Sequence, residues 1–458
     1  MIRPALLAAA ALLAAPACAA TDYTPAPFVQ VSHADWTRDA VLYQINTRQF
    51  TREGTFRAAQ AHLPRLADMG VDILWLMPIH PIGAESRKGG MGSPYSVRDY
   101  RAVNPDLGTE ADLRAFVDEA HRLGMKVILD WVANHSAWDN PLTASHPEWY
   151  ARTPEGAMMP PLGTDWSDVV AFDYRQPALR AYMTGSLTYW VREFGIDGYR
   201  ADVAGFVPTD FWETARAEME RIKPVFMLAE WEQRDLHARA FDATYAWTWK
   251  DAMKRAAKAT AAEGGAGALR GYYAEQANTW PRAAYRMVYT DNHDQNAWDG
   301  VAADIYGPAC PGAMALAFTG SGMPLIHNGQ EADLAHQLAF FEKDEIKWQE
   351  GRHAALLKQL VALKTRHSAL WNGEHGAPMV EVPTTDARDH VFAFTRGDAG
   401  KRVFAVFNLA PTPREVTFQF ARHHGAYADA LTGAPATFAA DTALTLPAWG
   451  FRIFAEDN

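Results

Sequence analysis

Four segments of this chain combine an acidic residue with a short apolar run, and residue types of this kind can do chemistry. The segments are 130–135, 198–202, 228–230 and 291–294. Taken singly each pattern is weak, because an acid after an apolar run is more often a helix N-cap or a structural ion pair. Together they bring Asp130, Asp202, Glu230 and Asp294 into one series, with Asn and His interleaved. Such a set predicts paired carboxylates that cleave a glycosidic bond by acid–base chemistry.

The apolar runs before these acids are too short and too apolar for surface helices, so they predict strands buried on both faces. They alternate with amphipathic stretches such as 58–69 and 110–123, which favours a parallel sheet wound by right-handed crossovers. Eight strands can close a (β/α)8 TIM barrel, whose carboxyl-end rim carries the chemistry. We predict strands at 41–46, 71–77, 127–130, 198–201, 226–229, 243–247, 286–290 and 323–327.

Two long loops, 78–104 and 135–176, are expected to lie over this rim, since neither has the length of an ordinary strand-to-helix connection. We therefore expect a catalytic barrel over 30–134 and 177–372, and a short lid domain over 135–176, inserted after strand 3. Beyond residue 376 short alternating runs replace helical periodicity, at 391–394, 402–407, 415–420, 443–446 and 450–454. They predict a C-terminal antiparallel β-sandwich domain over 376–458.

The composition narrows the class of ligand. The net charge of −11, with no run of Lys or Arg, argues against nucleic acid as a partner. The 16 Trp and 16 Tyr suit a sugar-binding cleft, although most such rings fill cores. A neutral oligosaccharide or polysaccharide is therefore the expected substrate. The sequence contains no apolar run long enough for a transmembrane segment. It does not decide the oligomeric state.

The first 20 residues read as a secretory signal peptide. Arg3 is followed by an Ala/Leu run and then by small residues up to Ala20, and the run is too short to span a membrane. Export to the periplasm or outside the cell is expected, with a mature chain that starts near Thr21. Lipid attachment at Cys18 is the alternative, although Ala15 stands where such sites usually have Leu. After cleavage only Cys310 remains, so no internal disulfide is expected.

The motifs together resemble those of glycoside hydrolase family 13, the alpha-amylase family, over nearly all of the mature chain. Asp130, Asn134 and His135 are similar to the first signature, and 195–202 is similar to the second, Gly-x-Asp-Gly-x-Arg-x-Asp. Glu230 resembles the third, and 292–294 the fourth. The resemblance extends to Tyr95 with 99–100 in the loop after the second strand and to 328–331 after the eighth.

The resemblance implies a retaining hydrolase of alpha-1,4-linked glucans or maltooligosaccharides, with a covalent glycosyl intermediate on Asp202. Glu230 would be the acid/base, with its proton affinity raised by burial. Asp294 would be the third acid, which binds sugar hydroxyls. Arg200 lies two residues before Asp202, on the same face of a strand, where its charge should keep Asp202 ionised.

Further site residues follow from the same resemblance. Tyr95, His135 and His293 would bind the reacting sugar, although a purely structural role is the alternative for a single His. No cofactor is required for the chemistry. Asn134 would be a ligand of a structural Ca²⁺ that ties the lid to the barrel, with a shell of oxygens completed by lid carboxylates. Candidate partners are Asp139, Asp165 and Asp168, for which solvated loop acids are the plain alternative.

The chain departs from the family pattern just after Asp202. Many members have Ala-Ala-Lys-His there, whereas this chain has Val203, Ala204, Gly205 and Phe206. Two polar contacts to a sugar on the leaving-group side are therefore missing, and Phe206 is expected to stack on a sugar ring instead. His327 also stands where a Tyr is common.

Rival functions stay open at this point. An exo-acting alpha-glucosidase or a transglycosylase shares the same acids, and the sequence does not separate endo from exo action. A catalytically inactive binding or transporter-partner module should have lost an acid, and all three are present. A metal-dependent hydrolase finds no His-x-His or His-Glu-x-x-His spacing to support it.

Export predicts that the mature protein lacks the residues before Thr21 and accumulates outside the cytoplasm. Mass spectrometry of the N-terminal peptide from fractionated cells tests this expectation. A diacylglycerol on Cys18 would reveal a lipoprotein instead, and a cytosolic chain that keeps Met1 would refute export.

Overall fold

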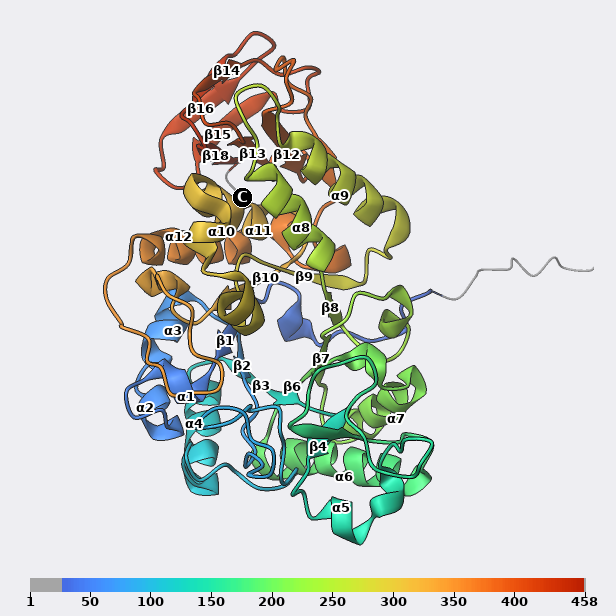
Figure 1. The fold of residues 1–458 in the computed structure, drawn as a ribbon. Helices are drawn as coiled ribbons and strands as arrows, with labels where there is room; N and C mark the ends of the chain where they lie inside the picture. Colours follow the sequence, from blue (N-terminus) through green and yellow to red (C-terminus); the bar gives the residue numbers. More distant parts are fainter. Residues whose placement is uncertain (1–26, 457–458) are drawn as a thin grey trace, which may run out of the picture.

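The computed structural model describes residues 27–456, so the leader and Cys18 lie outside the described residues. Eight parallel strands form a closed barrel in the order β1-β10-β9-β8-β7-β6-β3-β2 (Figure 1). They are β1 Leu42–Ile45, β2 Ile73–Leu76, β3 Lys126–Trp131, β6 Gly198–Ala201, β7 Phe226–Ala229, β8 Ala243–Tyr245, β9 Tyr285–Tyr289 and β10 Met323–His327. The predicted TIM barrel is confirmed, and each strand lies within about two residues of its predicted place.

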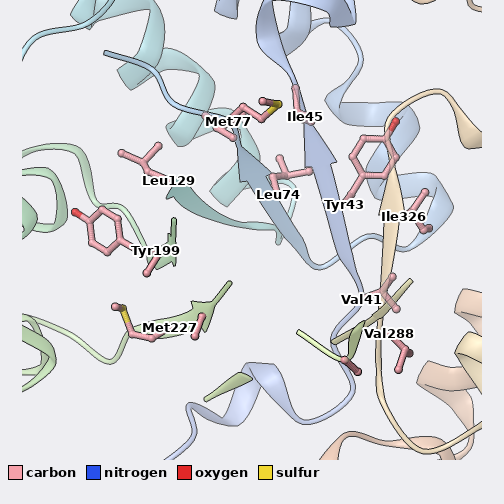
Figure 2. Packing of buried hydrophobic residues seen from close by; sticks show 14 of the residues in the cluster. Val41, Tyr43, Ile45, Leu74, Met77, Leu129, Tyr199, Met227, Val288 and Ile326 are labelled. Atoms are coloured by element: carbon pink, nitrogen blue, oxygen red, sulfur yellow. The ribbon is translucent and has the colours of Figure 1, made fainter. Parts of the chain in front are cut away.

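Strand periodicity divides the barrel side chains into two cores. Tyr43, Leu74 and Leu129 point outward and pack under the helices, as Figure 2 shows. Their neighbours Trp75 and Ile128 point inward and fill the barrel interior. Because side chains alternate along a strand, a residue two positions beyond an inward apolar residue also points inward. This rule brings the acids at the strand ends to the mouth of the barrel.

Helices surround the barrel. The predicted helix over 58–69 is two helices, because Pro64 lacks an N–H and suits only the first turn of a new one. Thr109 and Asp112 form a capping box that starts the helix predicted at residue 110. The helices are α1 Thr47–Phe50, α2 Phe56–Gln60, α3 Leu63–Met69, α4 Glu110–Arg122, α5 Leu142–Ser145, α6 Pro177–Phe194, α7 Thr209–Glu220, α8 Trp247–Ala256, α9 Ala266–Thr279, α10 Ala302–Tyr306, α11 Cys310–Thr319 and α12 Arg352–Arg366.

Residues 135–176, which we call the lid, leave the barrel after β3. The lid contains an antiparallel pair, β4 His135–Ala137 with β5 Val169–Ala171, and the short α5. His135 pairs with Ala171 in this ladder, so its position on the barrel rim is fixed by both ends of the lid. In Figure 1 the lid lies beside α6, away from the C-terminal domain.

The C-terminal domain has two antiparallel layers. Its main sheet has the order β11-β12-β13-β18-β15-β16, and β14 pairs with β17 in a second, two-stranded layer. Val416 of β14 and Leu446 of β17 pack in one apolar cluster with Phe404 and Phe454 of the main sheet. The strands are β11 Met379–Glu381, β12 Val391–Arg396, β13 Val403–Asn408, β14 Arg414–Val416, β15 Gly425–Asp429, β16 Pro435–Phe438, β17 Leu444–Leu446 and β18 Phe451–Ala455. The predicted sandwich is confirmed, although β11, β15 and β16 were not predicted.

The C-terminal domain packs on the helical side of the barrel, next to α8 and α9 in Figure 1. Tyr273 of α9 stacks on Phe392 of β12, with ring centroids 5.9 Å apart. The domain therefore leaves the barrel mouth free. Between residues 27 and 456 no helix is long and apolar enough to cross a membrane.

Candidate active site

The acids predicted from the sequence meet at the carboxyl ends of three adjacent barrel strands. Asp130 is the last but one residue of β3, Asp202 directly follows β6, and Glu230 directly follows β7. β6 pairs with both neighbours, and the register sets Asp130 opposite Arg200. All four side chains point inward by the strand alternation, so three acids and one guanidinium share the mouth of the barrel.

Arg200 links the three acids through one fully buried guanidinium. Its Nη1 donates to Asp130 Oδ1 at 2.8 Å and to Asp202 Oδ1 at 3.0 Å. Its Nη2 lies 2.8 Å from Glu230 Oε1. A guanidinium presents several N–H groups in a rigid plane, so these contacts fix the relative positions of the carboxyl groups as well as their charge.

A strained turn joins Asp202 to Glu230. Val203 has φ 36° and ψ 51°, in the left-handed region that β-branched residues rarely adopt. In this conformation its N–H donates to Glu230 Oε2 at 2.8 Å. Backbone strain of this kind persists where the surrounding structure imposes it, typically at functional sites. The turn therefore holds Glu230 from one side while Arg200 holds it from the other.

Burial raises the pKa values of all three acids. The pKa of Asp202 is raised to about 8, that of Glu230 to about 7 and that of Asp130 to about 7. Arg200 lowers each of these values, as expected, but burial and the mutual repulsion of the carboxylates outweigh it. The ionisation of Asp202 therefore depends on the balance between Arg200, which favours the charged form, and burial, which opposes it. Near neutral pH the cluster holds a proton, which a general acid requires.

A chain of hydrogen bonds orients Tyr95 and His293 beside these acids. The amide of Gln44 lies 2.7 Å from His293 Nδ1, and His293 Nε2 lies 2.6 Å from the Tyr95 hydroxyl. Tyr95 donates onward to Asp130 at 3.1 Å. This direction of donation fits a neutral imidazole protonated at Nε2, and burial lowers the pKa of His293 to about 3. Asp294 follows, with a side chain that is 41% exposed and free to meet a ligand.

The enclosed part of the site is a cavity of 620 Å³ that contains most of the predicted residues. Tyr95, His135, His293 and the acids Asp202, Glu230 and Asp294 all line it. Arg200 lies beneath the cavity floor. Asp165 and Asp168, named above as candidate calcium partners, also line the cavity, as does Val203. The lining residues that the sequence did not single out are Lys88, Ser93, Trp166, Val169, Trp298, Phe340 and Phe341.

Phe206 lies outside this enclosed part, on the Glu230 side. Its ring is 5.3 Å from that of Trp231 and 6.4 Å from that of Trp166, and the residue is 45% exposed. The departure at Gly205 has a steric reason, since a Cβ there would overlap the indole of Trp231. A Lys at position 205 is therefore incompatible with Trp231 in this place. Aromatic rings thus occupy the region where the Lys and His of many family members are absent.

The residues proposed for calcium do not form a carboxylate shell. Asp139 Oδ2 lies 3.3 Å from Arg98, and Asp168 Oδ1 lies 3.3 Å from Lys88. The Asn134 amide contacts the neighbouring His135 ring at 3.2 Å. One oxygen of Asp139 has no partner, but within residues 27–456 no group of three or more acidic, His or Cys side chains is arranged to hold a metal ion. The donors present do not fit the predicted ion, and calcium has no part in the mechanism below.

His327 supports the site from below instead of facing the cavity. Its Nδ1 lies 3.0 Å from Asp291 Oδ2, and both side chains are buried. Asp291 begins the segment that carries His293 and Asp294 at the end of β9. The His327–Asp291 pair therefore anchors that segment to β10.

The raised pKa of Glu230 predicts that this residue lowers the stability of the folded protein by an amount that depends on pH. A folded-state value of about 7, against about 4.3 in an unfolded chain, means that wild-type stability falls as the pH rises through this window. Glu230→Gln should become more stable than wild type by roughly 1–3 kcal/mol at pH 8 compared with pH 4.5. Urea unfolding at both pH values measures this change. Exposed Glu155→Gln is the control, and an equal difference at both pH values would contradict the prediction.

Two family models match this chain. The model described as "Alpha amylase, catalytic domain" covers residues 25–157 and 162–379, and that described as "Maltogenic Amylase, C-terminal domain" covers 381–453. The chain is also similar to curated proteins. It is 26% identical over 400 residues to the alpha-amylase MalA of Haloarcula japonica, a match that covers 83% of this chain and 57% of that protein. A cyclomaltodextrinase of Geobacillus thermopakistaniensis is 24% identical over 482 residues, a match that covers 93% of this chain and 78% of that protein.

Part of the chain resembles maltosyltransferases. It is 33% identical over 219 residues to an alpha-1,4-glucan:maltose-1-phosphate maltosyltransferase of Myxococcus xanthus, and spans 32% of that protein's length. Solved structures match more completely. An alpha-amylase from Lactobacillus plantarum has a TM-score of 0.80 and 31% identity, covering 92% of this chain and 99% of that one. A noncanonic maltogenic alpha-amylase, AmyB from Thermotoga neapolitana, has a TM-score of 0.81, 29% identity and the same coverage. This chain belongs to the alpha-amylase family.

Proposed function

We propose that this protein is a retaining glycoside hydrolase that cleaves alpha-1,4-linked maltooligosaccharides. The single observation that carries the proposal is the contact of one guanidinium, Arg200, with both Asp202 and Glu230 at the cavity floor. Retaining enzymes need their two carboxyl groups only about 5 Å apart, whereas inverting enzymes need a wider gap for a water. Two acids that share one guanidinium fit the narrow arrangement.

In the first step Asp202 attacks the anomeric carbon, and the bond from this carbon to the leaving oxygen breaks. Glu230 gives its proton to that oxygen. Positive charge that develops on the sugar lowers the pKa of Asp202, so the proton held by the cluster is left with Glu230. In the second step Glu230 takes a proton from water, the water oxygen bonds to the anomeric carbon, and Asp202 is released.

The neighbouring side chains bind the same sugar. Asp294 is a partly exposed acid in the cavity and accepts hydrogen bonds from sugar hydroxyls. The ring of Tyr95 offers a stacking face. His135, whose pKa burial lowers to about 3, and His293 are neutral, so they donate and accept hydrogen bonds without adding charge.

Transfer to a second sugar is the other candidate reaction. Phe206, Trp231 and Trp166 form an aromatic group on the side where Glu230 protonates the leaving oxygen. A sugar stacked there can attack the intermediate in place of water. Chromatography of the products from concentrated maltotriose separates the two reactions, because transfer gives oligosaccharides longer than the substrate. Starch, pullulan and sucrose in the same assay define the linkages that are cut.

Retention is tested by NMR on the first product from maltoheptaose. The alpha anomer should appear first, because two displacements at one carbon restore its configuration. Glu230→Gln is the control, with turnover reduced by about two to four powers of ten while the fold is kept. Initial release of the beta anomer would contradict the mechanism, and wild-type turnover in folded Glu230→Gln would remove Glu230 from its role.

The aromatic group predicts a preference for short substrates. Loss of two hydrogen bonds of about 0.5–1.5 kcal/mol each, with stacking on Phe206 in their place, favours maltooligosaccharides over soluble starch. Phe206→Ala should lower the ratio of the two kcat/KM values by about threefold to tenfold. Phe420→Ala, which removes a 77% exposed ring in the C-terminal domain, is the matched control. A higher kcat/KM on starch in the wild type, or an unchanged ratio in Phe206→Ala, would show that the ring has no such role.

A further inference from the structure

The two ends of the cavity differ, and Glu230 gives them a direction. Glu230 protonates the leaving oxygen, so the reducing-end part of a substrate passes over Phe206 and Trp231, which lie on its side. The non-reducing part must then extend the other way, past Tyr95. Phe340 stacks on Tyr95 there, with centroids 6.1 Å apart and planes 10° apart. The walls beyond Tyr95 therefore decide how many sugars fit on the non-reducing side.

Two loops meet at this far end, and we call their junction, residues 89–92 with 339–342, the clasp. The Gly90 N–H donates to Glu342 Oε1 at 2.6 Å, and the Met91 N–H donates to the Phe341 carbonyl at 3.0 Å. The approach needs glycine, because a Cβ at Gly89 would lie 2.5 Å from Phe341 Cβ, and one at Gly90 would lie 2.5 Å from Glu342 Oε2. The double glycine thus lets one backbone close against the other loop.

A buried cation holds the clasp from inside the protein. Arg48, in helix α1 just after β1, is 6% exposed and donates from Nη1 to the Gly92 carbonyl at 3.0 Å and from Nη2 to the Phe340 carbonyl at 2.9 Å. Gln49 adds a bond to the Ala339 carbonyl at 2.8 Å. One guanidinium therefore binds both loops at once, which makes their separation costly.

The first loop also joins the lid. Lys88 Nζ donates to the Asp165 carbonyl at 3.2 Å and lies 3.3 Å from Asp168 Oδ1. Ser96 donates to the Asp168 carbonyl at 3.0 Å. Lid, first loop and second loop thus form one hydrogen-bonded wall around the far end. On the Glu230 side, by contrast, the lid meets the 204–206 turn through the rings of Trp166 and Phe206, and Phe206 is 45% exposed.

We infer that the clasp closes the non-reducing side of the cleft, so that the enzyme acts from the non-reducing ends of alpha-glucan chains and releases short products. This inference rests on the proposed function and specifies its substrate as a chain end. The cavity volume of 620 Å³ is enough for a short oligosaccharide segment. The longer part of the substrate leaves through the open side, across Phe206.

The test compares maltoheptaoside with the same oligosaccharide blocked by an acetal across O4 and O6 of its non-reducing-end glucose. The wild type should cut the unblocked form at least about 100-fold faster, and should leave β-cyclodextrin, which has no chain end, intact. If the blocked form or β-cyclodextrin is cut within about threefold of the unblocked rate, the inference is wrong and the hydrolase assignment stands. If no maltoheptaoside is cut, the proposed function fails, and the inference fails with it.

Variants of the clasp test its cause. Glu342→Ala removes the acceptor of the Gly90 bond, and Gly90→Val forces the loops apart, so both should raise cleavage of the blocked form relative to the unblocked form by about tenfold. Glu342→Gln keeps the acceptor oxygen and is the matched control, with a wild-type ratio expected. Thermal unfolding of each variant confirms that the fold is kept. A wild-type ratio in folded Glu342→Ala and Gly90→Val would show that the clasp does not close the cleft.

Discussion

The structure of the barrel mouth depends on one buried charge, that of Arg200. A guanidinium with no exposure is stable only if acids surround it, and three acids that crowd together are stable only if a cation lies among them. Burial lowers the pKa of Arg200, but Asp130 and Glu230 raise it further, and the net value is well above the ordinary one. The two histidines of the site stay neutral beside this charge. His135 and His293 are held unprotonated, and Lys88, which also lines the cavity, lies against Asp168 of the lid.

The same constraint explains the division of labour in the fold. The inward apolar cluster with Trp75 and Phe226 fills the barrel below the acids, which keeps water from the guanidinium and makes its interactions strong. Strand pairing fixes the position of each acid along the barrel axis. The left-handed turn at Val203 then connects Asp202 to Glu230, because the Val203 N–H donates to the Glu230 carboxyl group. Positions fixed by the sheet are rigid. The lid and loops then decide what can reach them.

The barrel, its strands and the acids could be predicted from the sequence because their signals are local. An apolar run followed by an acid can be recognised within a window of about ten residues, and the alternation of side chains along the strand then fixes the direction in which the acid points. The prediction of one continuous helix over 58–69 was wrong, because the chain forms two helices here. Pro64 is the sequence signal that could have shown the break. In the C-terminal domain, β15 and β16 escaped prediction because they are half-exposed and lack a clear alternation of apolar residues.

The walls of the cavity could not be predicted, since they arise from contacts between distant segments. Phe340 and Phe341 lie in an irregular stretch and Trp298 lies in a one-turn helix, and nothing local shows that these rings face the acids. The raised pKa of Asp202 could not be predicted for the same reason, because burial by many distant residues opposes the effect of Arg200, the one neighbour that the sequence shows. Two of the three acids expected around calcium, Asp168 and Asp139, lie instead against Lys88 and Arg98, and the sequence gives no sign of these contacts.

The overlap between position 205 and Trp231 also restricts how this enzyme can change through evolution. A Lys or even an Ala at position 205 requires the indole to move or to be replaced by a smaller side chain. A small residue in place of Trp231, with Gly205 kept, would leave a void beside the ring of Phe206. Neither single change is expected to be neutral, so a Lys at position 205 calls for a paired substitution of Trp231. The two residues form an epistatic unit, and sequence libraries that sample them one at a time would miss the functional combinations.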